Sequence, residues 1–117
     1  MTKIRPVVFF EIRGRDAKRL REFYAALFDW QIDTSNPAYA FVGPGEGGPE
    51  LGVSGGIAQA GEPGVSIYVQ VADLTESLAQ GEALGGKALL PPTDVPGGPT
   101  IARLQDPEGN VIGLVQQ

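Results

Sequence analysis

Hydrophobic and polar residues alternate along the chain in a pattern that occurs twice. Residues 7–12 have the β-branched and aromatic content of a strand, and apolar residues then recur at helical spacing over 17–28. Asp16 is a favourable N-cap for this helix. Its apolar positions form one face, which is expected to face the core: Leu20, Phe23, Tyr24, Leu27 and Phe28. For Phe28, and for Trp30 after the helix, a dimer contact is the alternative. Short strands are then predicted at 30–33, 39–42 and 51–54, and residues 55–64 are typical of a linker.

The second occurrence of the pattern starts at residue 65. Residues 65–71 alternate as a strand, Asp73 is an N-cap with Glu76 three residues later, and Gly85 closes the helix that follows. Three more strands are predicted at 87–90, 100–105 and 110–116. The two capping aspartates, at positions 16 and 73, lie 57 residues apart. This order predicts an α+β fold made of two β-α-β-β-β units, the alternative being a coincidental order of elements in an α+β protein.

Composition narrows the chemistry that such a fold can perform. A chain of 117 residues, 42% of them hydrophobic, can build the core of one domain. The sequence contains no cysteine and no histidine, which excludes disulfides, thiolate nucleophiles and imidazole metal sites. Acid–base catalysis would therefore depend on a carboxylate, a lysine or a tyrosine.

The charge distribution bears on the partners of the protein. The net charge is −5, which disfavours nucleic acid and anionic membranes, although seven of the nine basic residues lie within residues 1–21. The chain has no apolar run long enough for a membrane span and no signal-peptide pattern at its start. We expect a cytoplasmic protein that binds neither nucleic acid nor membranes.

Several segments together resemble a known superfamily. They are residues 9–12, Asp16, the helix with Phe23-Tyr24, residues 68–73, residues 84–86 and the turn 106–110. In order and spacing they are similar to the vicinal-oxygen-chelate superfamily, which includes glyoxalase I, bleomycin-resistance proteins and extradiol dioxygenases. The resemblance covers about residues 5–116. It implies one domain, with module one at about 5–57, a linker at 58–64 and module two at about 65–117, whose strands form an incomplete curved barrel around a cavity, and it implies a homodimer.

The resemblance also points to a metal site. In metal-using members, four side chains on the concave surface, typically His, Glu or Gln, hold a divalent ion. The corresponding positions in this sequence are Phe9, Gly52, Ser66 and Gly113. None of these is a good ligand for a divalent ion, so no metal and no cofactor is predicted. The alternative is a rebuilt carboxylate site that uses Glu11 or Glu50, each two residues from one of these positions.

Strand alternation divides the side chains between two faces of the predicted sheet. The apolar positions Val8, Phe10, Ile12, Ile67, Val69, Val71, Ala102 and Leu104 are expected on the helix side. The predicted ligand-binding residues on the other face are Phe9, Glu11, Tyr68, Gln70 and Arg103. Such a set suits a small, partly aromatic molecule with polar groups. The structural alternative is that Glu11 pairs with Arg103 or Arg13 and that Tyr68 fills the barrel.

Three functions remain open at this point. The first is metal-free binding of a small molecule, for sequestration, resistance or sensing. The second is a lyase, isomerase or dioxygenase-like enzyme of the same superfamily, in which Glu11 acts as the base and Tyr68 or Arg103 steadies a developing oxyanion. The third is an interaction domain without a ligand.

Overall fold

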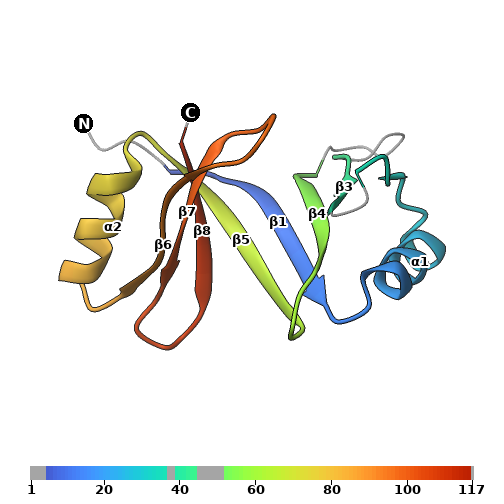
Figure 1. The fold of residues 1–117 in the computed structure, drawn as a ribbon, viewed down its shortest axis with the longest axis horizontal. Coiled ribbons are helices and arrows are strands. Elements are labelled where there is room, and N and C mark those ends of the chain that lie inside the picture. Colours follow the sequence, from blue (N-terminus) through green and yellow to red (C-terminus); the bar gives the residue numbers. More distant parts are fainter. Residues whose placement is uncertain (1–4, 37–38, 45–51, 117) are drawn as a thin grey trace. The chain divides into compact units, whose positions relative to one another are not determined.

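The structure, a computed structural model, describes residues 5–36, 39–44 and 52–116. The chain divides into two compact units. We call residues Phe9–Val65 module one, and the described residues of 66–117 together with those of 1–8 module two. Figure 1 labels the elements in both modules.

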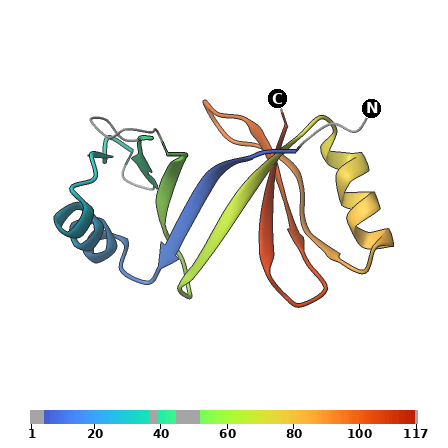
Figure 2. The same cartoon turned by 180° about the vertical axis from the view of Figure 1, so that it is seen from behind.

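Module one contains one helix and four strands. Strand β1 (Val7–Gly14) leads into α1 (Ala17–Phe28), followed by β2 (Ile32–Asp33), β3 (Tyr39–Val42) and β4 (Ser54–Gln59). The strands pair in the order β2-β3-β4-β1; β4 is parallel to β1, and the other pairs are antiparallel. Helix α1 packs on one face of these strands (Figure 2).

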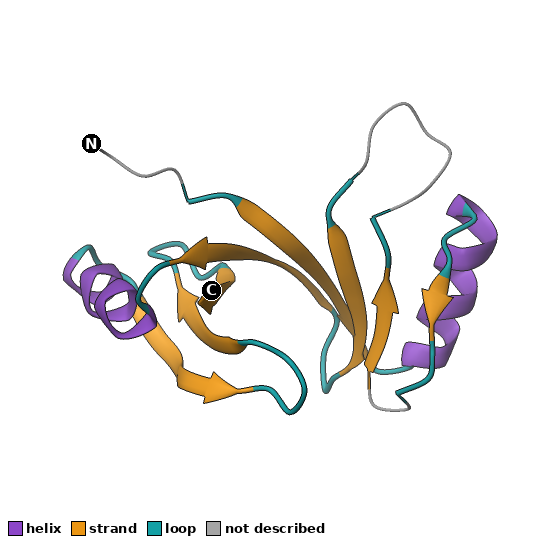
Figure 3. Cartoon of the chain, turned by 90° about the horizontal axis from the view of Figure 1, so that it is seen from above, coloured by secondary structure: helices purple, strands orange, loops and turns teal. Residues whose placement is uncertain are grey.

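Module two repeats this topology. Its elements are β5 (Gly64–Val71), α2 (Leu74–Ala83), β6 (Lys87–Asp94), β7 (Thr100–Gln105) and β8 (Val111–Gln116). The strands pair in the order β6-β7-β8-β5, again with one parallel pair, β5 with β8. A single helix accompanies the strands of each module (Figure 3). The predicted α+β fold of two β-α-β-β-β modules is thus confirmed.

Both helices begin at the predicted aspartates. Asp16 Oδ1 accepts a hydrogen bond from the backbone N–H of Arg19 at 3.0 Å, and Asp73 Oδ1 accepts one from Glu76 at 3.0 Å. Each bond satisfies one of the backbone donors that the first turn of a helix leaves without a partner.

A second capping side chain comes from the last strand of each module. Gln59 Oε1 accepts a hydrogen bond from the N–H of Ala17 at 2.9 Å, and Gln116 Oε1 accepts one from Leu74 at 3.1 Å. Both pairs repeat at the same 57-residue offset as the aspartates. The duplication therefore extends to the contacts that join each helix to its sheet.

Each module has its own core between helix and strands. In module two, Leu74 and Leu78 of α2 pack on the sheet with Val69, Val71, Ala88, Ala102, Leu104, Ile112 and Leu114. In module one, the core is formed by Ala17, Ala40, Val42 and Ile57, with Phe10, Ile12, Leu20, Tyr24, Trp30 and Ile32 against them. The predicted helix-side positions Phe10, Ile12, Val69, Val71, Ala102 and Leu104 are confirmed.

The prediction that Phe23 and Leu27 of α1 face the core is wrong, because these side chains are 55% and 58% exposed. Phe28, expected in the core or at a dimer contact, is 54% exposed and its ring packs against Trp30. The contact of a helix with one sheet is a narrow stripe, which here follows Ala17, Leu20 and Tyr24. Side chains to either side of that stripe stay in solvent even where their spacing is helical.

The predicted placement of Ile67 beneath the helix is wrong as well. Ile67 is 38% exposed and lies outside the core cluster, whose contacts on β5 begin at Val69. Helix α2 therefore covers only the second half of that strand.

The strand predicted at 51–54 is also wrong, because β4 runs from Ser54 to Gln59 through residues expected to be a linker. The Gly55-Gly56 pair in this strand is typical of a loop, but in the structure the aromatic rings of Phe10 and Tyr39 lie over it. A Cβ on Gly55 would lie 2.2 Å from the Phe10 ring, and one on Gly56 would lie 2.1 Å from Tyr39. Glycine is required here because an aromatic side chain occupies the space of a Cβ on each face of the strand.

The predicted turn between β7 and β8 is confirmed. Asp106 Oδ1 accepts hydrogen bonds from the N–H groups of Glu108 and Asn110, and Oδ2 accepts one from Asn110 Nδ2, all at 2.9 Å. The side-chain hydrogen bond from Asn110, followed by the backbone bonds, lowers the pKa of Asp106. No helix in the described part of the chain is long and apolar enough to cross a membrane.

Candidate functional site

Glu11 is the centre of the polar cluster in module one. Its side chain is on the face of β1 opposite Phe10 and Ile12, which contact the helix side, and the residue is only 3% exposed. Glu11 Oε1 accepts a hydrogen bond from Arg13 Nη1 at 3.2 Å, and Oε2 accepts one from the Tyr39 hydroxyl at 2.9 Å. Both carboxylate oxygens are therefore held by neighbouring side chains, which compensates for the burial of the charge.

The contact between Tyr39 and Glu11 spans three strands. Tyr39 is on β3 and Glu11 on β1, and β4 lies between them with Gly56 in register with Glu11. Any side chain at position 56 would occupy the space that the Tyr39 ring and hydroxyl fill, since its Cβ would lie 2.1 Å from both. The glycine thus lets a side chain from one neighbouring strand reach the other.

Module two has the same arrangement, in which a glycine on the middle strand lets side chains of the two outer strands meet, but with different side chains. Tyr68 on β5 and Arg103 on β7 are both in register with Gly113 on the intervening strand β8. Arg103 Nη2 donates to the Tyr68 hydroxyl at 3.4 Å, and the Tyr68 ring covers Gly113, where a Cβ would lie 2.4 Å from it. Tyr68 is 5% exposed.

The two clusters occupy equivalent positions of the repeat. Glu11 and Tyr68 are 57 residues apart, as are Gly56 and Gly113. The first strand of each module thus supplies a buried polar side chain, Glu11 or Tyr68. The last strand supplies a glycine, and the hydrogen bond to that side chain from a third strand, made by Tyr39 or Arg103, passes over it. The cluster of module one offers a carboxylate, a phenol and a guanidinium group, and that of module two offers a phenol and a guanidinium group. Such groups form directed hydrogen bonds with polar groups of an organic ligand.

The predicted site residues divide between the modules. Phe9 and Glu11 belong to module one, and Tyr68, Gln70 and Arg103 belong to module two, where the structure brings Tyr68 and Arg103 together. The pairing of Glu11 with Arg13, which the sequence left as an alternative, is present.

The structure places Gly52, one of the positions inferred for the metal, before β4 rather than in a strand. The residue equivalent to Gly113 in the repeat is Gly56, because Gly56 faces Glu11 as Gly113 faces Tyr68. This difference follows from the misplaced strand at 51–54. Glu50, the other candidate for a rebuilt carboxylate site, lies outside the described residues. Within 5–36, 39–44 and 52–116, no three Asp or Glu side chains are grouped so that they could hold a metal ion.

Sequence reasoning missed Tyr39 as a site residue. Its contact with Glu11 joins positions 28 residues apart through a third strand, and local alternation does not encode such a contact. The signal that could have found it is the Gly55-Gly56 pair, because consecutive glycines inside a strand indicate side chains that pack over the backbone.

Comparison with known proteins agrees with the architecture. The family model described as a glyoxalase-like domain matches residues 8–115. No curated protein matches the sequence. Among solved structures, a hypothetical protein from Bacillus halodurans C-125 is 14% identical with a TM-score of 0.71, covering 98% of this chain and 96% of its own.

Two further structures carry functional descriptions. Methylmalonyl-CoA epimerase from Streptomyces coelicolor, in complex with 2-nitronate-propionyl-CoA, is 17% identical with a TM-score of 0.68, covering 98% of this chain and 96% of its own. A glyoxalase/bleomycin resistance protein/dioxygenase superfamily member from Vibrio splendidus 12B01 is 15% identical with a TM-score of 0.66, covering 97% of this chain and 100% of its own. At these identities the likeness shows a shared fold. Since the family model spans nearly the whole chain, the protein belongs to the glyoxalase-like domain family.

Proposed function

We propose that this protein binds a small, partly aromatic molecule without a metal ion, in the manner of a sequestering, resistance or sensing protein. The observation that carries the proposal is the pair of glycines at the centres of the two polar clusters. Gly56 and Gly113 stand opposite Glu11 and Tyr68, and an aromatic ring covers each of them. The last strand of each module therefore presents no donor atom at the position where a chelating side chain is needed.

The remaining positions that the superfamily uses for metal do not suit a divalent ion either. Phe9 has no donor atom, and Ser66 offers one neutral hydroxyl. Glu11 is the acidic side chain nearest to these positions in module one, but Arg13 and Tyr39 bind its two oxygens. These side chains do not fit a metal, and we assign no step to one.

The engagement of Glu11 also favours binding over acid–base catalysis. A general base needs a carboxylate oxygen within hydrogen-bond reach of the substrate proton. In Glu11, one oxygen accepts from a guanidinium and the other from a phenol, so the carboxylate is anchored in place. An anchored acid of this kind orients neighbouring donors, which is what a binding site requires.

The test is a thermal-shift screen of aromatic metabolites and antibiotics on the purified protein, run with a chelator and separately with Mn²⁺, Zn²⁺ or Ni²⁺. A ligand at 100 times its Kd should stabilise the fold by about 2.7 kcal/mol, equally with and without chelator. Stabilisation that needs the divalent ion would overturn the metal-free part of the proposal. A screen in which no compound raises the unfolding temperature would favour the interaction domain.

A matched pair of variants then locates the ligand. Tyr68→Phe removes one hydroxyl from the module-two cluster and keeps the ring over Gly113, whereas Tyr24→Phe makes the same change in the core beneath α1. We expect Tyr68→Phe to weaken binding by roughly two- to tenfold, the value of one hydrogen bond, and Tyr24→Phe to leave the Kd unchanged. Should a hit be turned over, Glu11→Gln decides the rival function, because an enzyme with Glu11 as base would lose its activity.

A further inference from the structure

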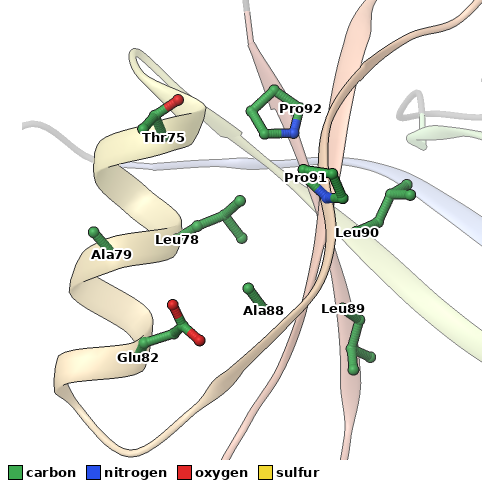
Figure 4. A pocket seen from close by; sticks show the side chains of 9 residues that line it. All are labelled: Thr75, Leu78, Ala79, Glu82, Ala88, Leu89, Leu90, Pro91 and Pro92. Atoms are coloured by element: carbon green, nitrogen blue, oxygen red, sulfur yellow. The ribbon is translucent and has the colours of Figure 1, made fainter.

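The same surface groove occurs once in each module, between the helix and the second strand. In module one it is lined by Lys18, Arg21, Glu22 and Ala25 of α1 and by Trp30, Gln31, Ile32 and Thr34 in and around β2. In module two it is lined by Thr75, Leu78, Ala79 and Glu82 of α2 and by residues 88–92 of β6 (Figure 4). The volumes are about 360 and 350 Å³.

The lining positions match through the internal repeat. Positions at the 57-residue offset are 18 and 75, 21 and 78, 22 and 79, 25 and 82, 31 and 88, 32 and 89, and 34 and 91. The groove is therefore a property of the duplicated fold. The side chains that line the groove differ between the two modules, and these differences indicate what each groove can bind.

In module two the groove is mostly apolar, and Leu78 and Ala88 join it to the core. Leu78 points from α2 toward β6 and is only 7% exposed (Figure 4). The opposite wall is formed by the partly buried Leu90 and by the exposed Leu89, Pro91 and Pro92. None of the residues that line this copy is basic.

In module one the position of Leu78 is taken by Arg21. Arg21 is partly buried, and within the described residues it makes no hydrogen bond and no ion pair. Arginine carries five N–H donors. No buried side-chain nitrogen among the described residues lacks a partner, so the guanidinium nitrogens of Arg21 reach solvent while its stem is partly covered, and they are accessible to an anion. A leucine would suit the same place, as module two shows, so the fold does not require the arginine.

The neighbours of Arg21 complete a site for an anion. Lys18 lies one turn earlier on the same helix face, and its Nζ is 3.8 Å from Glu22 Oε1 in an exposed, weak ion pair. Trp30 forms the apolar wall, held against Tyr24, Phe28 and Phe10 at ring-centroid distances of 5.2, 5.5 and 5.6 Å. Thr34 and Gln31 add a hydroxyl and an amide.

We propose that the α1–β2 groove of module one is a second binding site, for a small aromatic anion such as an aryl phosphate or an aryl carboxylate. The anionic group pairs with Arg21, which can donate two parallel hydrogen bonds, and with Lys18. The aromatic part lies against Trp30 and Ile32. The groove is large enough for a molecule of that size. This site is independent of the polar clusters around Glu11 and Tyr68.

The experiment uses the fluorescence of Trp30, the only tryptophan of the chain. Phenyl phosphate is titrated into the full-length protein, with benzylamine as a probe that has the same ring and opposite charge. We expect a saturable change in Trp30 emission with phenyl phosphate, which weakens as salt is added, and none with benzylamine.

Two arginine variants carry the same change in charge. Arg21→Leu installs the side chain that module two has at the equivalent position, and Arg19→Leu alters an exposed arginine of the same helix outside the groove. Arg21→Leu should raise the Kd roughly tenfold or more, the value of a hydrogen bond to a charged group, and Arg19→Leu should change it less than about twofold. Circular dichroism should show that Arg21→Leu keeps the parent fold, because module two has leucine at the equivalent position.

Several outcomes would overturn the site. They are a response without saturation, an equal response to benzylamine, and equal losses in the two arginine variants, since equal losses indicate only the diffuse positive field of α1. Should Arg21→Leu fail to fold, Arg21→Gln with a circular dichroism check serves instead. Tyr68→Phe should leave the titration unchanged, so that failure here and failure of the proposed function stay distinguishable.

Discussion

Gly113 is the position at which a single methyl group should do the most damage to the module-two cluster. In Gly113→Ala, the new Cβ would lie 2.4 Å from Cδ2 and Cε2 of Tyr68 and 2.6 Å from Cζ. Ordinary van der Waals contact begins at 3.4 Å. The Tyr68 ring must therefore move by about 1 Å or β8 must shift, in a part of the sheet where both residues are buried.

The cost follows from that displacement. Forcing extra volume into a packed site costs about 1–3 kcal/mol. The Arg103 Nη2 to Tyr68 hydroxyl distance is already 3.4 Å, so a 1 Å movement also breaks this hydrogen bond, worth about 1 kcal/mol. Alanine offsets part of the loss by restricting the unfolded chain. We expect a net destabilisation of about 2 kcal/mol, or roughly a 10 °C fall in Tm for a domain of this size.

Thermal and urea unfolding followed by circular dichroism measure this effect. The matched control is Gly61→Ala, because Gly61 lies in the β4–β5 loop with no atom within 4 Å of an added Cβ. Its Tm should equal or slightly exceed that of the parent. The reasoning would be refuted if Gly113→Ala unfolded within a degree or two of Gly61→Ala.

Two further predictions concern the caps and turns. Gln116→Ala removes the acceptor for the N–H of Leu74 at the start of α2, so the free energy of unfolding in urea should fall by about 0.5–1.5 kcal/mol and the Leu74 amide should exchange faster. The control is Gln80→Ala, an exposed position on the same helix, which should leave the stability unchanged. Equal losses in the two variants would contradict the capping role. Hydrogen bonds from Asn110 lower the pKa of Asp106 in the folded state, so the stabilisation is present at neutral pH and is lost as the pH falls through that lowered pKa. Asp106→Ala should accordingly be less stable than the parent at neutral pH and approach it in acid, and a difference that did not vary with pH would exclude this linkage.

The elements with strong local signals were predicted from the sequence because their causes are local. A capping aspartate, a periodic apolar stripe and an Asp-Pro-Glu-Gly turn each act over a few residues, and α1 and the turn at 106–110 occur where these signals place them. The repeat of two aspartates at 57 residues was enough to indicate the duplicated fold.

These local signals do not predict how strands that are distant in the sequence pair with one another. The Gly55-Gly56 pair has low intrinsic preference for a strand, yet β4 passes through it because Phe10 and Tyr39 cover its two faces. The sequence therefore placed this strand too early, at 51–54, and did not reveal that Tyr39 contacts Glu11 over Gly56. The width of the contact between α1 and the sheet also depends on the tertiary structure. Because the contact is narrow, Phe23 and Leu27 are exposed.

By itself the sequence determined the α+β class, the duplicated β-α-β-β-β order, the helix starts and the absence of histidine and cysteine ligands. Only the tertiary structure decided which side chains meet across the sheet: Glu11 with Tyr39 over Gly56, and Tyr68 with Arg103 over Gly113. It also decided that Arg21 stands where the second module has a core leucine. The physical reason is that helix and turn formation depend on neighbours in the chain, whereas these contacts depend on the register between segments that are far apart in it.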